Sequence, residues 1–175
     1  MKKLKTGEVL ELAGKVLAQS EPLPGIDAGL VAALCRAESG CYPGAVRYEA
    51  DYRYTIAPVS LEAGVRPVEC SLETEAILQR CSLGLMQIMG ATARELGFRG
   101  WLTGLLEPEA GVRWGVEYLR HQHRRYFSLY GPDAVIAAYN AGSMRTRKSG
   151  EFVNQAYVDR VRRIRQRLNG QGGKA

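Results

Sequence analysis

Apolar residues repeat at helical spacing along most of this chain. The first such stretch lies within residues 1–22 and predicts an amphipathic helix. Its inward face is formed by Val9, Leu12, Ala13, Val16 and Leu17. The next predicted helix follows the Pro22 to Gly25 turn and ends at Ser39-Gly40. Its apolar face consists of Leu30, Val31, Leu34 and Ala37.

The spacing of apolar residues changes after this helix, from a helical repeat to alternation. Residues 46–54 alternate between apolar or aromatic and polar side chains, which is typical of a half-buried strand. Pro58, Gly64 and Pro67 then mark a loop. Ser71 is expected to cap a helix that has acidic residues in its first turn. Residues 85–96 are predicted to be helical or nearly so.

The second half of the chain is predicted to be helical as well. Residues 109–130 form the longest expected helix, Pro132 begins an Ala-rich helix that ends at Gly142, and residues 153–168 form the last helix. The sequence has no internal repeat and no clear linker. It therefore predicts one domain over residues 1–175, predominantly α-helical, of the α+β class, with a small strand region after the second helix.

One acidic residue stands out beside the second apolar face. Glu38 closes that predicted helix, where burial would disfavour the charged carboxylate and raise its pKa. A raised pKa suits a group that donates a proton near neutral pH. Within its own segment, a solvated glutamate in the last helical turn is the more common interpretation.

Composition narrows the classes of partner. The chain is 46% hydrophobic and 24% charged, as in ordinary globular domains, and its formal net charge of +6 suits an anionic partner. The basic residues between Arg160 and Arg167 share their segment with an apolar stripe, so we expect a packed helix with a basic outer face and no nucleic-acid partner. No apolar run predicts an integral membrane segment. His121 and His123 are expected to face solvent.

The cysteines do not indicate a metal site. Cys35, Cys41, Cys70 and Cys81 form no CxxC pair and have no histidine at ligand spacing, so we expect neither a metal nor a cofactor. Both disulfides and buried free thiols are compatible with this even number.

Four short segments occur in a fixed order. They are Glu38-Ser39, Gly84-Leu85-Met86-Gln87-Ile88, Ala138-Tyr139-Asn140-Ala141-Gly142 and Phe152 to Val158. Together they resemble the soluble lytic transglycosylase family of peptidoglycan-cleaving enzymes, relatives of goose-type lysozyme. The resemblance spans about residues 26–161. It implies a lysozyme-like fold and a substrate made of peptidoglycan glycan strands.

The resemblance also implies roles for single residues. Glu38 would be the general acid and then the general base in forming a 1,6-anhydromuramoyl product. The predicted substrate-binding residues are Ser39, Ser82, Gly84, Met86, Gln87, Tyr139, Asn140 and Tyr157. Core filling by Met86, a surface position for Tyr139 and simple anchoring of the last helix by Tyr157 are the structural alternatives.

The chain departs from the family pattern in two places. Residues 42–81 form a long insertion that we expect to lie over the cleft, and Val153 stands where many members carry a glutamate. The insertion brings Glu49 and Asp51, either of which would position a water in a muramidase of the lysozyme type. The simpler interpretation is that both acids pair with Arg47 and Arg53 on a solvated strand.

Two further expectations concern the cellular context. A non-catalytic wall-binding component is the alternative from another class, although such a protein has no need of an acid at position 38. No export signal follows Met1-Lys2-Lys3-Leu4-Lys5, so we expect a monomer delivered to the periplasmic or extracellular wall by a phage, a holin or a secretion apparatus.

Overall fold

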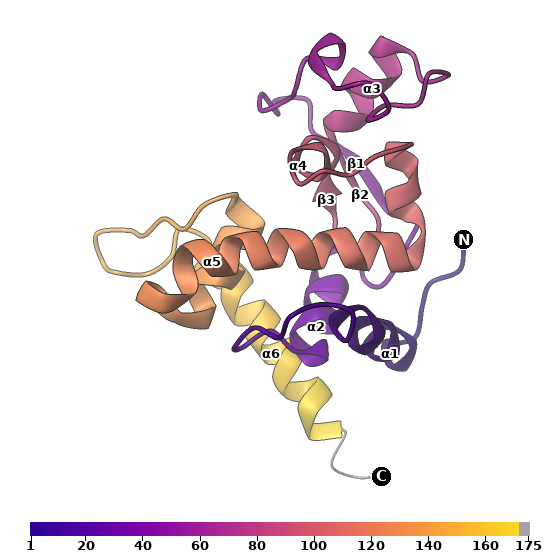
Figure 1. The fold of residues 1–175 in the computed structure, drawn as a ribbon. Helices are drawn as coiled ribbons and strands as arrows, with labels where there is room; N and C mark the ends of the chain where they lie inside the picture. The colour runs from indigo at the N-terminus through magenta and orange to yellow at the C-terminus, as the bar shows by residue number, and fades with distance from the viewer. Residues whose placement is uncertain (172–175) are drawn as a thin grey trace.

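The long helix α5 (Pro108–Ala141) separates two groups of elements in the computed structural model, which describes residues 1–171 (Figure 1). On one side lie α1 (Thr6–Leu17), α2 (Ala28–Glu38) and α6 (Gln155–Gln171). On the other side lie a small sheet and the short helices α3 (Leu72–Gln79) and α4 (Gly90–Glu95). The result is a predominantly helical α+β fold, as the sequence predicts.

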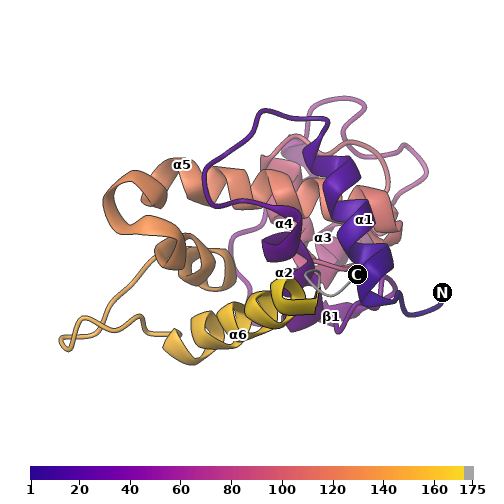
Figure 2. The same cartoon turned by 90° about the horizontal axis from the view of Figure 1, so that it is seen from below.

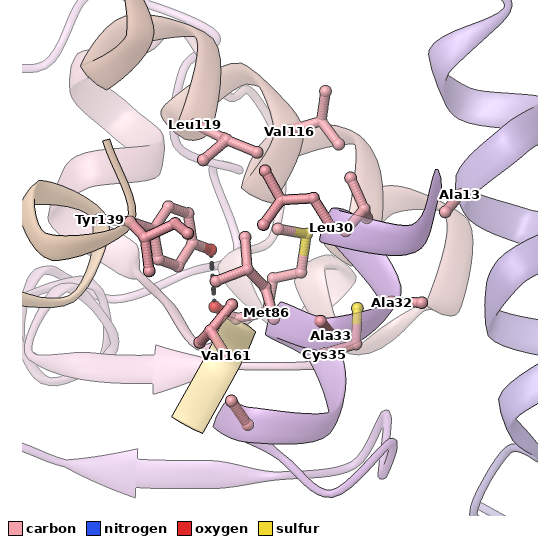
Figure 3. Close-up of a cluster of buried hydrophobic side chains, with 14 of the residues drawn as sticks. Ala13, Leu30, Ala32, Ala33, Cys35, Met86, Val116, Leu119, Tyr139 and Val161 are labelled. Carbon is pink, nitrogen blue, oxygen red and sulfur yellow. Dashed lines mark hydrogen bonds between the residues drawn. The ribbon is translucent and has the colours of Figure 1, made fainter. Parts of the chain in front are cut away.

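Helix α2 forms the centre of the main core. It packs against both α1 and α6, and residues Gly29 to Cys35 are all buried (Figure 2). The Asp27 side chain caps this helix by accepting a hydrogen bond from the Leu30 N–H at 2.7 Å. Small residues on α2 allow close packing, so that Met86, Val116 and Val161 reach the same cluster (Figure 3). The core thus holds the end of α2 in a fixed position.

Helix α5 is broken near its C-terminal end. Gly131 has φ 74° and ψ −173°, outside the helical region, and Pro132 begins the next helical segment. Gly142 caps this segment in the left-handed conformation, with φ 75°. The predicted division at Pro132 and the predicted stop at Gly142 are therefore confirmed. Between α5 and α6 the chain forms a projecting loop, closed by a bridge between Thr146 and Phe152 (Figure 2).

The sheet has three antiparallel strands in the order β1-β2-β3. They are β1 (Val46–Tyr48), β2 (Cys81–Leu83) and β3 (Ile88–Met89), and Val46 pairs with Leu83. The predicted strand over residues 46–54 is too long, because regular pairing ends at Tyr48 and the following residues form a loop. A short 3₁₀ helix, η1 (Pro58–Ser60), lies between this loop and α3, and a second, η2 (Leu102–Leu106), precedes α5.

The prediction of a helix over residues 85–96 is wrong for its first half. Gly84 and Gln87 have positive φ values of 75° and 49°, and they turn the chain between β2 and β3. A side chain at Gly84 would place its β-carbon 2.2 Å from the Leu105 carbonyl oxygen, so this turn requires glycine. Within residues 85–96, only α4, from Gly90 to Glu95, is helical.

A buried polar network holds the insertion against α4. The Arg94 guanidinium donates to both carboxylate oxygens of Glu75 at 2.8 and 2.9 Å, and both side chains are fully buried. Gln79 Nε2 donates to Glu75 at 3.2 Å, and Gln79 Oε1 accepts from the Ile56 backbone N–H at 2.8 Å. These bonds join α3, α4 and the loop after β1 into one unit.

Two other expectations are resolved by the side chains. All four cysteines are buried free thiols. His123 is buried, contrary to prediction, because Nε2 lies 3.0 Å from the Pro24 carbonyl oxygen and the ring stacks on Phe127.

Within residues 1–171, no group of three or more histidine, cysteine or acidic side chains is arranged to hold a metal ion. No helix in this described part is long and apolar enough to cross a membrane.

Candidate active site

A cleft of about 760 Å³ runs between the sheet and α5. One wall is formed by Arg47, Ser82, Gln87 and Met89 of the sheet region, by residues 49–52 and Tyr54 of the insertion, and by Thr92 and Glu95 of α4. The other wall comes from α5 and the residues just after it, namely Tyr118, His121, Gln122, Arg125 and residues 139–143. Glu38 lines this cleft from the end of α2. The insertion therefore supplies part of the cleft wall.

Glu38 combines partial burial with a specific hydrogen-bond donor. The Tyr157 hydroxyl, from the first turn of α6, donates to Glu38 Oε1. Burial raises the pKa of Glu38 above its ordinary value of 4.5, while the Tyr157 hydrogen bond and the charges of Arg47 and Arg160 lower it in part. The burial effect is the largest, so Glu38 keeps its proton to higher pH than an exposed glutamate.

Tyr157 remains a hydrogen-bond donor at all working pH values. Its burial and the adjacent Glu38 both raise the pKa of this phenol. The carboxylate formed when Glu38 loses its proton would therefore keep this donor. The structure thus brings together two residues that are far apart in the sequence.

Ser39 and Tyr139 hold the segment that follows β2. Ser39 Oγ lies 2.8 Å from the Leu85 carbonyl oxygen and 3.0 Å from the Cys35 carbonyl oxygen. The Tyr139 hydroxyl donates to the Met86 carbonyl oxygen at 2.8 Å (Figure 3). Both hydroxyls are bonded to backbone, which fixes this segment relative to α2 and α5.

The side chain of Met86 does not line the cleft. It is fully buried in the main core, and a β-carbon on Gly115 would lie only 2.5 Å from its sulfur. The predicted groove contact by this side chain is therefore wrong, and its alternative, core filling, is what the structure shows. Gly84 likewise does not line the cleft and serves the turn described above.

Gln87 and Ser82 do lie in the cleft wall. Gln87 Nε2 donates to the carbonyl oxygens of Ala45 and Gly84, both at 3.0 Å, and its Oε1 accepts from Ser82 Oγ at 2.9 Å. These bonds fix the orientation of the Gln87 amide. Asn140, on the opposite wall, is exposed and accepts from Asn154 Nδ2 at 2.9 Å.

The candidate second carboxylates also line the cleft. Glu49 pairs with Arg47 at 2.5 Å, and Asp51 is exposed in the loop after β1. Glu38 is accordingly the cleft carboxylate with a burial-raised pKa and a phenol donor, whereas Glu49 is held by a neighbouring cation.

Several lining residues were not predicted from the sequence. Tyr118, Gln122, Tyr52 and Arg125 are in this group, and so is His121, which is exposed as predicted. A usable signal existed for Gln122, because it falls on the buried stripe of α5 with Val112 and Leu119. A polar side chain on such a buried apolar stripe is unusual, and this marks Gln122 as a candidate site residue.

A mostly helical domain with a small antiparallel sheet, and with a partly buried glutamate at the cleft between them, has a lysozyme-like fold. The chain matches the family model of the transglycosylase SLT domain over residues 16–157, and it belongs to this family. Members are peptidoglycan lytic transglycosylases, which are glycosidic-bond lyases, so this protein is an enzyme whose substrate is the cell wall outside the cytoplasm. Comparison with curated proteins and with solved structures gives no significant match.

Proposed function

We propose that Glu38 is the proton-transfer group of this lytic transglycosylase. The observation that carries the proposal is its position: a partly buried carboxyl in the cleft wall, with a pKa raised by burial and a phenol bonded to one oxygen. A protonated carboxyl near neutral pH is what a general acid requires. The substrate would be the β-1,4 bond between N-acetylmuramic acid and N-acetylglucosamine.

The proposed reaction uses Glu38 twice. Its proton first passes to the glycosidic oxygen, and the bond from that oxygen to C1 of the muramoyl sugar breaks. The Glu38 carboxylate then takes the proton of the C6 hydroxyl while the C6 oxygen bonds to C1, which closes a 1,6-anhydro ring and restores the acid. Because the nucleophile belongs to the substrate, proximity replaces a bound water.

Tyr157 supports both halves of this cycle. Its hydrogen bond stabilises the carboxylate that exists between the two proton transfers. The same bond holds one oxygen of Glu38, so that the other is directed for proton transfer. The substrate acetamido group is expected to stabilise the positive charge that develops at C1.

Hydrolysis is the second candidate function. Its supporting observation is that Glu49 and Asp51 line the same cleft as Glu38. A water held by either acid would attack C1 in place of the C6 hydroxyl, as in a muramidase. Against it, Glu49 is paired with Arg47 and Asp51 is exposed, so neither has the fixed surroundings of Glu38.

The Glu38→Gln variant tests the proposal. Glutamine keeps the shape and the contact with Tyr157 but has no transferable proton, so we expect no release of soluble fragments from purified peptidoglycan. Glu62→Gln is the matched control, since Glu62 is exposed and lies outside the cleft. Circular dichroism checks that both variants are folded. Wild-type turnover by folded Glu38→Gln would refute the assignment.

A further inference from the structure

Two cysteines flank the end of α2, one before Glu38 in the sequence and one after it. Cys35 is fully buried in the helix and belongs to the main core (Figure 3). Cys41 follows the helix and is 4% exposed in the same core cluster. Both are free thiols, so the structure describes the reduced protein. The segment that carries Glu38 thus lies between two buried thiols.

The turn after α2 brings these two cysteines together. Ser39 is the C-cap, Gly40 has a left-handed φ of 61°, and the Cys41 N–H donates to the Cys35 carbonyl oxygen at 3.2 Å. This bond limits the separation of the two α-carbons to about 7 Å, and disulfides usually join α-carbons about 4.4 to 6.8 Å apart. Helix ends with a left-handed residue commonly place the side chain two positions after the C-cap against the last helical turn. The backbone therefore suits a bond between Cys35 and Cys41.

The backbone of Cys41 is fixed in an uncommon conformation. Its φ of 66° is left-handed, and within residues 1–171 Gln87 is the only other residue besides glycine with a positive φ. The Cys41 carbonyl oxygen also accepts a hydrogen bond from the Leu4 N–H at 3.0 Å. The charge of a Cys41 thiolate is one cause of the raised pKa of Cys35, as expected for neighbouring thiols. These contacts keep the Cys41 side chain near the end of α2.

We propose that Cys35 and Cys41 form a disulfide when the enzyme folds in an oxidising compartment. Its substrate lies outside the cytoplasm, where disulfides form and persist. The Cys41 thiolate attacks the disulfide of an external oxidant and releases one thiol from it. The Cys35 thiolate then attacks the Cys41 sulfur and releases the second thiol. Two electrons and two protons thus pass from the protein to the oxidant, which leaves as two thiols.

The bond forms while the chain folds, before this segment is buried. The thiolate is the reacting species, and burial raises the pKa of both thiols in the folded protein, so exchange there is slow. In the completed fold the same burial shields the disulfide from reductants. The closed loop contains Glu38, so the bond holds the end of α2 that lines the cleft. This modification goes beyond the proposed function, because its formation does not depend on what Glu38 does.

Peptide mapping of the wild-type chain tests the proposal. The reduced, denatured enzyme is refolded with equal amounts of oxidised and reduced glutathione, free thiols are blocked with iodoacetamide, and trypsin is added without reductant. Trypsin cuts after Arg36, which separates the two cysteines into peptides 16–36 and 37–47. The expected product is this pair joined by a disulfide and lighter than the separate peptides by two hydrogen atoms. Enzyme exported to a bacterial periplasm should give the same map with no refolding step.

The disulfide should also raise thermal stability. Closing the loop from residue 35 to residue 41 should raise the Tm of the oxidised wild type by roughly 5 °C over that of the protein reduced with dithiothreitol. Cys41→Ala should lose both the joined peptides and this difference in Tm. Cys70→Ala is the matched control, because Cys70 is also a buried thiol but lies in the insertion, and this variant should keep both.

Three results would overturn the disulfide. They are blocked Cys35 and Cys41 in folded wild-type enzyme from both preparations, a bond from either of them to Cys70 or Cys81, and equal Tm values for the oxidised and reduced wild type. None of these measurements uses catalysis. An error about Glu38 therefore leaves the result readable.

Discussion

The hydrogen bond from Tyr157 to Glu38 should control the pH range of activity. Tyr157→Phe keeps the ring and removes only the hydroxyl that donates to Glu38 Oε1. That donor favours the ionised carboxylate and so lowers the pKa of Glu38, against the larger opposing effect of burial. The variant should therefore hold the Glu38 proton to higher pH than the wild type does.

The size of the effect follows from the kind of bond that is lost. A hydrogen bond to a charged group contributes about 1.5 to 3 kcal/mol, and about 1.4 kcal/mol corresponds to a tenfold change in an equilibrium constant. Loss of the hydroxyl should move the midpoint of Glu38 ionisation upward by about 1 to 2 pH units. The maximal rate should fall by about tenfold or more, because the carboxylate formed during the reaction also loses its donor.

The assay is the initial rate of peptidoglycan solubilisation from about pH 4 to about pH 9, taken at low substrate so that it reports kcat/KM. The wild-type rate should fall as pH rises through the pKa of Glu38, since an ionised Glu38 has no proton to give. In Tyr157→Phe this falling limb should lie at higher pH. Tyr130→Phe is the control, because Tyr130 is exposed and outside the cleft. If the falling limb lies at the same pH in Tyr157→Phe as in the wild type, the Tyr157 hydrogen bond does not set the ionisation of Glu38.

Two further predictions concern stability. Because the pKa of Glu38 is raised in the folded state, its contribution to stability is fully present below its unfolded pKa and is lost as pH rises through the folded value. Denaturant unfolding of Glu38→Gln should thus show a smaller loss of stability between about pH 5 and pH 8 than the wild type, and parallel curves would contradict this. Arg94→Leu should lower the free energy of unfolding by about 3 to 5 kcal/mol, because it leaves the Glu75 charge buried without its partner. A loss below about 1 kcal/mol would contradict a stabilising role for this buried ion pair.

Local signals in the sequence were sufficient for the helices that frame the site. The apolar face of α2 and the small residues at Ser39-Gly40 belong to one short segment, and they place Glu38 correctly at its end. The break in α5 is equally local, since Gly131 and Pro132 together cannot continue a helix.

The sequence predictions were wrong where contacts between segments far apart in the chain determine the structure. Alternation over residues 46–54 resembles a strand, but the loop after Tyr48 is held by Gln79 through the Ile56 backbone. Such a side-chain contact leaves no periodic trace in the sequence. The position of Met86 was also set by contacts with a distant segment. Its carbonyl oxygen accepts a hydrogen bond from the Tyr139 hydroxyl, and its side chain is buried in the core.

Partnerships within the site were the least predictable feature. The pairing of Tyr157 with Glu38 joins α6 to α2, and the Arg47 to Glu49 ion pair depends on where β1 ends. Gln122 could be recognised as anomalous from its place on an apolar stripe, but only the three-dimensional structure shows that its oxygen lacks a donor and that it reaches the cleft.

The central claim is that Glu38 deprotonates a hydroxyl of the substrate, not a water. The most direct measurement is the mass of the muropeptides that the wild-type enzyme releases from purified peptidoglycan. Products carrying a 1,6-anhydromuramoyl end, one water lighter than their hydrolytic counterparts, are the predicted result. Products with reducing muramoyl ends would contradict it and would direct attention to Glu49 and Asp51.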